Sequence, residues 1–178
     1  MPAPGVVPML SVERYRVEGS AATEIVRSMA AAARESGGFM GYHTWNLRYS
    51  YRTQDSGGRC RFSNVRIEVS SQMRVPEWQR PPDPPAELVA QWEAFSTALD
   101  DHERGHRQIA FDGAGEISRR LRDLQDMSCS SLQVEGDREA RRLLAQTGER
   151  QRQFDTETQH GTGTGAVWPP RPQPPPVR

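Results

Sequence analysis

The chain has 178 residues, 35% of them hydrophobic, and this length suggests a single domain. Its 23 basic and 23 acidic residues give no net charge, which argues against a nucleic acid or an anionic membrane as partner, since both require a basic surplus. No stretch approaches the roughly 18 apolar residues of a membrane span.

The first part of the chain predicts a short strand and a helix. Residues 1–10 are rich in proline and small residues and indicate a flexible N-terminal segment. A strand is predicted from Val12 to Val17. Ser20 is then the predicted N-cap of an amphipathic helix over residues 22–33, which Gly37 and Gly38 would end.

Two alternating segments follow and predict an antiparallel hairpin. Apolar and aromatic residues alternate with polar ones from Phe39 to Tyr51 and again from Arg61 to Met73, and Asp55–Gly58 forms a turn between them. Within the second strand, Val65–Val69 is the segment expected to pair with an extended substrate. The proline-rich segment Val75–Pro85 is predicted to be a linker.

The linker leads into the motif H-E-x-x-H, formed by His102, Glu103 and His106, in a helix predicted over about 86–124 or broken near Gly113 or Gly115. Residues i and i+4 lie on one helix face, so the two imidazoles can hold one zinc ion while Glu103 acts as a base. The alternative is a pair of buried histidines with ordinary hydrogen bonds. The motif lies on a stripe of apolar residues at helical spacing, which predicts that both histidines point inward: Leu88, Trp92, Phe95, Leu99, Ile117, Leu121 and Leu124.

A second helical pattern is predicted over residues 136–158, and it ends by the glycine-rich segment 161–165. One weakly apolar face of this helix is shared by Ala140, Leu144, Thr147, Gln151, Phe154 and Thr158. Residues 169–178 are predicted to be a proline-rich disordered tail or tether. Because a glycine inside a helix costs about 1 kcal/mol relative to alanine, Gly105 is expected to allow close packing of a strand or of substrate backbone.

A catalytic zinc usually takes three protein ligands and a water, so a third ligand is required. His160 follows the second helical pattern, where a loop could bring it to the first helix, and Asp155 or Glu157 could supply a carboxylate instead. His43 and Tyr42 are candidate donors to a developing oxyanion, although His43 is alternatively a packed residue on its strand. The full set of candidate third ligands is His160, Asp155, Glu157, Asp112, Glu116 and His43.

Cys60 and Cys129 are the two cysteines of the chain. They could form one disulfide, which would imply an oxidising compartment, or remain two buried thiols. Closing so long a loop could add about 4 kcal/mol in the chain-entropy model. The first residues have neither the basic nor the apolar region of a signal peptide. The expected location is therefore secreted or periplasmic with a leader outside this chain, or alternatively cytoplasmic.

The chain resembles a bacterial family of secreted zinc-dependent proteases that is catalogued chiefly as a domain of unknown function. The resemblance covers most of residues 11–168, the expected single domain. It rests mainly on the H-E-x-G-H motif and on the block Asp155-x-x-Thr158-x-His160-Gly161, in which Asp155 and Thr158 are candidate residues for orienting the ligands. Further support comes from Tyr15-x-Val17-x-Gly19, Trp45, Pro76-x-Trp78, Trp92 and Cys129. The resemblance makes His160 the expected third ligand, and the family usually has Tyr at the position of Phe154.

These observations predict an α+β, zincin-like fold, with a small antiparallel sheet packed on the long motif helix and two further helices. The expected function is a zinc metallopeptidase with one zinc ion, which hydrolyses a peptide or protein substrate through a zinc-bound water with Glu103 as general base. Two alternatives are a catalytically inactive zincin-like binding or scaffold module, and a zinc amidase that acts on a non-protein amide such as cell-wall material.

Overall fold

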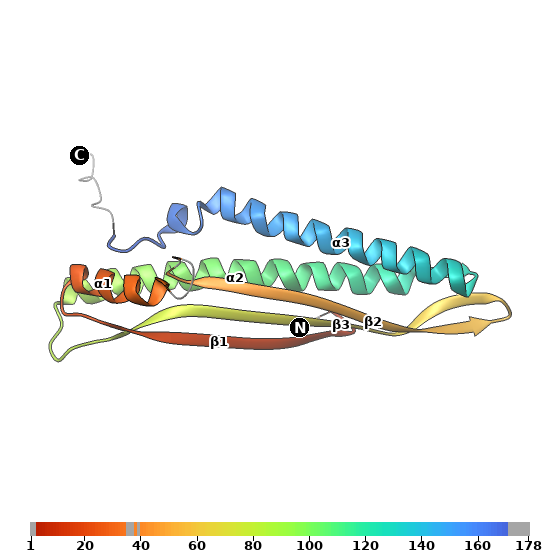
Figure 1. Cartoon of the computed structure of the whole chain (residues 1–178), viewed down its shortest axis with the longest axis horizontal. Coiled ribbons are helices and arrows are strands. Elements are labelled where there is room, and N and C mark those ends of the chain that lie inside the picture. Colours follow the sequence, from red (N-terminus) through yellow and green to blue (C-terminus); the bar gives the residue numbers. More distant parts are fainter. Residues whose placement is uncertain (1–2, 35–37, 39, 171–178) are drawn as a thin grey trace. The chain divides into compact units, whose positions relative to one another are not determined.

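The computed structural model describes residues 3–34, 38 and 40–170. These residues form an α+β structure, as predicted, and Figure 1 shows its elements in chain order. The elements are β1 (Val6–Glu18), α1 (Ala22–Ala33), β2 (Tyr42–Ser56), β3 (Arg59–Gln79), α2 (Ala86–Asp123), β4 (Gln125–Met127), α3 (Cys129–Thr158) and the 3-10 helix η2 (Thr162–Thr164). Most of the predicted proline-rich tail, residues 171–178, and the predicted helix end at Gly37 lie outside the described residues.

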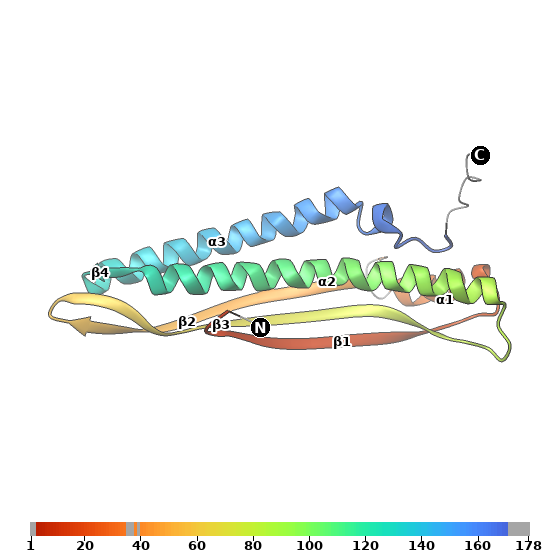
Figure 2. The same cartoon turned by 180° about the vertical axis from the view of Figure 1, so that it is seen from behind.

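The sheet is mixed, and the prediction of an antiparallel sheet was wrong. Strand β3 lies between β1 and β2, and the short strand β4 pairs antiparallel with the start of β3. The turn between β2 and β3 is closed by the Gly58 backbone amide, which donates to the Asp55 carboxylate at 2.8 Å. Figures 1 and 2 show the strand directions: helix α1 lies between β1 and β2 in the chain, and β2 runs in the opposite direction to β1. Strand β3 then runs in the same direction as β1. The hairpin itself is therefore antiparallel, whereas β1 and β3 are parallel.

The strands are longer than the sequence predicted. Strand β1 begins at Val6, inside the segment 1–10 that was expected to be flexible, because the Val6 side chain is buried in the core. Strand β3 continues to Gln79 through the first half of the predicted linker, because Val75 and Trp78 are buried on its inner face. In both places the prolines predicted a loop or linker, although the neighbouring apolar residues are buried in the tertiary structure.

Two helix starts also differ from the prediction. The N-cap of α1 is Ala21, not Ser20; the amide and hydroxyl of Ser20 instead donate to the Glu24 carboxylate at 2.7 and 2.8 Å. Helix α3 begins at Cys129, seven residues before the predicted start at residue 136. There the Ser128 hydroxyl accepts a hydrogen bond from a backbone amide of the first turn, which is the usual role of an N-cap side chain.

Helix α2 is unbroken from Ala86 to Asp123, so neither Gly113 nor Gly115 interrupts it. Gly113 permits a close approach instead: a β-carbon there would overlap the side chain of Thr147 on α3. No helix in the described ranges is both long and apolar enough to cross a membrane.

The chain divides into two compact units. The first unit comprises Met1–Ser11, His43–Gln72 and Gly105–Phe154, and the second comprises Val12–Tyr42, Met73–Arg104 and Asp155–Arg178. Each has its own apolar core. The core of the second unit is rich in aromatic rings and includes Trp78, Trp92, Phe95 and Trp168. The predicted apolar stripe is buried throughout, in the second unit at Leu88, Trp92, Phe95 and Leu99 and in the first unit at Ile117, Leu121 and Leu124, the last of which directly follows α2.

Candidate active site

The motif residues lie on the buried face of α2. His102, Glu103 and His106 are 6%, 3% and 8% exposed, which confirms the prediction that the motif points inward. Because α2 is continuous through the motif, the two histidines are one helical turn apart on the same face. Three polar side chains on a buried helix face require partners, and those partners come mainly from α3.

In the first unit, Gln151 of α3 holds His106 by two hydrogen bonds. Its side-chain oxygen pairs with His106 Nδ1 at 2.6 Å, and its side-chain nitrogen donates to the His106 backbone carbonyl at 2.9 Å. Because an amide oxygen can only accept, we assign the imidazole proton of His106 to Nδ1 and its lone pair to Nε2. The Phe154 ring packs edge-on against the imidazole, with centroids 5.0 Å apart. Such fixing of one ring nitrogen is typical of a histidine that binds a metal through the other.

The contact of Phe154 with α2 also explains Gly105. A β-carbon at Gly105 would overlap the Phe154 ring. The expected close packing at this position is therefore confirmed, but the neighbour is an aromatic side chain of α3 and not a strand or a substrate backbone.

In the second unit, His102 contacts the end of α3 and the turn that follows it. Thr158 Oγ1 lies 3.3 Å from His102 Nδ1, and Asp155 Oδ1 lies 3.5 Å from His102 Nε2. Gly161 packs against the face of the imidazole: its φ is +81°, and a β-carbon there would lie 3.1 Å from His102 Cγ. The sequence block that ends in His160-Gly161 therefore frames His102, and any larger residue at Gly161 would be both strained and crowded.

The two strongest candidates for a third ligand, Asp155 and His160, are in contact. Asp155 Oδ1 lies 3.4 Å from His160 Nδ1. The Asp155 side chain is 30% exposed, whereas that of His160 is 67% exposed. Asp155 is thus the candidate that approaches His102 directly, and His160 approaches Asp155. Glu157, the other predicted carboxylate, is exposed on the outer face of the helix. The choice of His160 as third ligand stays a prediction.

Glu103 has an altered acidity. Burial of its carboxyl group raises its pKa to about 7, and the nearby negative charges of Asp155 and then Asp100 contribute in the same direction. A carboxyl group with a pKa in this range can both accept and release a proton near neutral pH, which suits a general base.

The candidate oxyanion donors Tyr42 and His43 fall in different units. Tyr42 is the first residue of β2 and is half-buried in the second unit. His43 belongs to the first unit, where its Nε2 lies 2.8 Å from the Ser71 hydroxyl and its ring stacks on His106 with centroids 6.0 Å apart. Burial lowers the pKa of His43 to about 4, with further lowering by His106 and Arg107, so this imidazole is neutral at pH 7.

Two predicted carboxylate candidates on α2 are engaged away from the motif. Asp112 accepts a hydrogen bond from Gln108 at 2.9 Å. Glu116 binds the guanidinium of Arg150 on α3 through both of its oxygens, at 2.7 and 3.0 Å. Neither residue belongs to the group of possible metal ligands that the described residues form around the motif.

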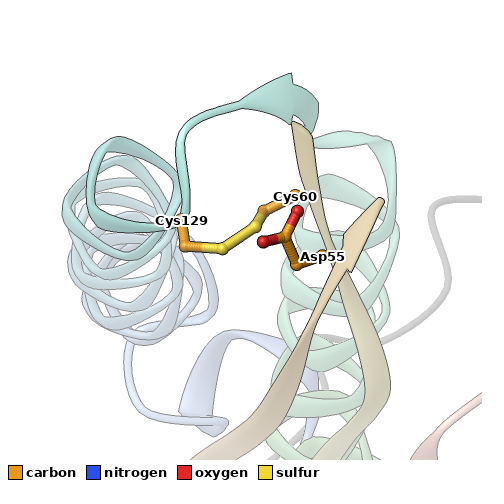
Figure 3. Close-up of side chains that lie close together, drawn as sticks. All are labelled: Asp55, Cys60 and Cys129. Carbon is orange, nitrogen blue, oxygen red and sulfur yellow. A yellow bond between two sulfur atoms is a disulfide. The ribbon is translucent and has the colours of Figure 1, made fainter. Parts of the chain in front are cut away.

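The predicted disulfide between Cys60 and Cys129 is present, and it joins the start of β3 to the start of α3 in the first unit (Figure 3). The exposed carboxylate of Asp55 lies beside it, as Figure 3 shows. This trio resembles a metal site in residue type only, because the two sulfur atoms are bonded to each other and neither is a thiolate. The predicted substrate strand is wrong: Val65, Ile67 and Val69 are buried in the core, and β3 has a neighbouring strand on each side.

Sequence reasoning did not identify Gln151, Ser71 or Arg107 as site residues. For Gln151 a signal was present, since it is a polar residue on the inner face of the predicted second helix. Ser71 and Arg107 gave no such signal, because an isolated serine on a strand and an arginine next to the motif are common.

Residues 12–161 match the family model described as a bacterial protein of unknown function, DUF922. The match includes the motif helix, all of α3 and the His160-Gly161 pair, and it agrees with the family resemblance noted in the sequence. No curated protein and no solved structure matches the chain.

Proposed function

Because this chain belongs to DUF922, a bacterial family of unknown function, its activity has to be argued from its own residues, and we propose that it is a zinc metallopeptidase with a zincin-like site. One observation carries the proposal: each buried motif histidine has its Nδ1 atom engaged by a side chain of α3. Gln151 engages His106, and Thr158 engages His102. This arrangement supports Nε2 of both rings as the proposed metal-binding atoms.

The donor set fits zinc. His102, His106 and Asp155 supply two imidazoles and one carboxylate that could together hold a metal ion. Imidazole and carboxylate groups are the ligands that zinc takes in catalytic sites with three protein ligands. Either Asp155 completes the set, or His160 does so while Asp155 orients it from 3.4 Å away.

The chemistry is divided between the metal and Glu103. Zinc, when bound, would polarise the scissile carbonyl group and lower the pKa of a coordinated water to about 7. Glu103 would take a proton from the attacking water and deliver it to the leaving amine. Its buried carboxyl group, with a pKa raised to about 7, is suited to both transfers near neutral pH.

The disulfide supports a location outside the cytoplasm. Disulfides persist in oxidising compartments and are rare in the cytosol. With Cys60 and Cys129 paired, we propose that the protein is secreted or periplasmic and that its substrate is a peptide or protein found there.

The test compares wild type with Glu103→Gln for zinc content and for cleavage of casein and of a peptide library. We expect both proteins to carry one zinc ion and only wild type to cleave. Glu157→Gln, which changes an exposed carboxylate on α3, is the matched control and should cleave as wild type does. Equal cleavage by wild type and Glu103→Gln would refute the proposed base.

The same samples distinguish the alternative functions. Release of products from purified cell-wall material without peptide cleavage would identify a zinc amidase. Bound zinc without hydrolysis of either substrate would identify an inactive scaffold module. Absence of zinc from wild type and from His102→Ala alike would refute the metal site.

A further inference from the structure

Three polar side chains from different elements of the first unit form a connected group. His43 lies on β2, Ser71 on β3 and Arg107 on α2. The Ser71 hydroxyl lies 2.8 Å from His43 Nε2 and accepts a hydrogen bond from Arg107 Nε at 3.3 Å. Ser71 is fully buried, at 0% exposure, so its hydrogen bonds are those that the protein supplies.

These contacts favour one placement of the protons. Arg107 Nε can only donate, so the Ser71 oxygen accepts from it. We assign the Ser71 hydroxyl proton to the contact with His43 Nε2, which makes Nε2 the unprotonated nitrogen of the neutral ring. The proton of His43 is consequently on Nδ1.

His43 Nδ1 is a buried donor without an acceptor. Of the buried side-chain nitrogen and oxygen atoms in the described residues, His43 Nδ1 is the one without a hydrogen-bond partner. Native proteins rarely leave such an atom unsatisfied, and each instance calls for a functional or structural explanation. The ring is also stacked almost parallel on His106, at an interplanar angle of 7° and a centroid distance of 6.0 Å.

The two stacked rings therefore have the same tautomer, with the proton on Nδ1 and the lone pair on Nε2. They differ in what is engaged: in His106 the Nδ1–H is bound to Gln151, whereas in His43 the Nε2 lone pair is bound to Ser71 and the Nδ1–H is unused. We infer that His43 Nδ1 donates a hydrogen bond to the carbonyl oxygen of the scissile amide and stabilises the negative charge that develops there, with Ser71 as the positioning residue that fixes the tautomer. This inference rests on the proposed hydrolase function, to which it adds the oxyanion donor.

The first experiment measures the tautomer directly in zinc-free protein that carries 15N-labelled histidine. Two-bond 1H–15N correlation spectra should show the His43 proton on Nδ1 in wild type. In Ser71→Ala, which lacks the hydroxyl donor, the Nε2–H form should become populated. A wild-type His43 with its proton on Nε2 would overturn the inference without any assay of activity.

The second experiment uses a matched pair of substitutions. The side-chain nitrogen of Asn can take the place of Nδ1, whereas that of Gln reaches the place of Nε2. We expect His43→Asn to stay within about tenfold of wild type and His43→Gln to lose roughly 100- to 1,000-fold in kcat with little change in KM. Equal activity of wild type and His43→Gln would overturn the inference.

Inhibitor binding separates an oxyanion donor from a residue that is merely packed. A peptide phosphonate carries a negative oxygen at the place of the oxyanion and should bind His43→Gln more weakly, by a factor parallel to the loss in kcat. A peptide hydroxamate, which binds chiefly through metal chelation, should bind both proteins equally. Equal weakening of both inhibitors would indicate general damage and refute the specific role. A zinc-loaded wild type that cleaves nothing would refute the proposed function, whereas an active wild type with unimpaired His43 variants would refute this inference alone.

Discussion

The surroundings of the two motif histidines differ in kind. His106 is held by the neutral amide of Gln151 at 2.6 and 2.9 Å and by the edge of the Phe154 ring. Beside His102, the hydroxyl of Thr158 lies 3.3 Å from Nδ1 and the carboxylate of Asp155 lies 3.5 Å from Nε2. Both rings are buried, but the side chain that holds His106 is a neutral amide, whereas a carboxylate lies directly against Nε2 of His102.

This difference suggests that the two histidines on this helix are supported in different ways and for different purposes. The neutral hydrogen bonds at His106 fix the orientation and tautomer of a ring without adding charge. Burial, and in addition the carboxylates of Asp155 and Asp100, keep the pKa of Glu103 high, and these carboxylates can attract a cation. Four predictions test the roles of these residues and of their neighbours on the helix.

The largest effect is expected at Glu103. In Glu103→Gln the shape of the side chain is kept but the base is lost, so kcat/KM should fall roughly 10²- to 10⁴-fold, the range of a positioned general base. Initial rates on a fluorogenic peptide measure this loss, and equilibrium dialysis should show unchanged zinc. A fall of less than threefold would remove Glu103 from the chemistry.

The next largest effect shows whether Asp155 or His160 is the third zinc ligand. Loss of a residue that only orients a ligand weakens zinc binding by roughly 10- to 100-fold. Replacing the residue that binds zinc itself with Ala should weaken zinc binding by more than that. Competition with a chromogenic chelator measures both variants, and Glu157→Ala serves as the control. Equal, small losses for Asp155→Ala and His160→Ala would place the third ligand elsewhere.

The third effect compares the supports of the two histidines. Gln151→Ala removes two hydrogen bonds from a buried ring and should weaken zinc binding roughly 10- to 100-fold. Thr158→Val removes one longer contact in a half-exposed position and should weaken binding less. Isothermal titration of both metal-free proteins gives the ratio. A larger loss of zinc affinity for Thr158→Val than for Gln151→Ala would contradict the proposed roles of these two side chains.

The smallest effect concerns Gly105. A methyl group there would overlap the Phe154 ring, and such overpacking costs about 1–3 kcal/mol, of which the better helix propensity of alanine returns about 1 kcal/mol. Urea titration should therefore show a modest loss of stability in Gly105→Ala. In a Phe154→Ala background the same substitution should be neutral or stabilising, and a loss of equal size there would show that Phe154 is not the cause.

Much of α2 could be predicted from the sequence because one periodic stripe runs through it, from Leu88 to Leu121, with both histidines in register. A local pattern is sufficient when a helix buries one face over its whole length. The motif itself was recognisable for the same reason, since i,i+4 spacing is a property of the helix alone.

The partners of the histidines were harder to predict because they depend on packing between elements distant in the chain. Gln151 lies 45 residues after His106, and nothing local shows that its amide reaches back to the motif. The strand ends were predicted wrongly for a related reason. Val6 and Trp78 have prolines on both sides, which suggest a loop, and their burial becomes evident only once the sheet has formed.

The bond between Cys60 and Cys129 has a consequence for biosynthesis. The two cysteines are 69 residues apart, so at about 5–20 residues per second the ribosome adds the second roughly 3–14 s after the first. During that interval Cys60 is a thiol whose partner cysteine has not yet been added to the chain. Any disulfide that forms in that time can only join Cys60 to another molecule. All of α2 lies between the two cysteines, so the whole motif helix has emerged before the loop can close. The yield of correctly paired protein should therefore depend on how quickly the chain is completed relative to how quickly its thiols are oxidised.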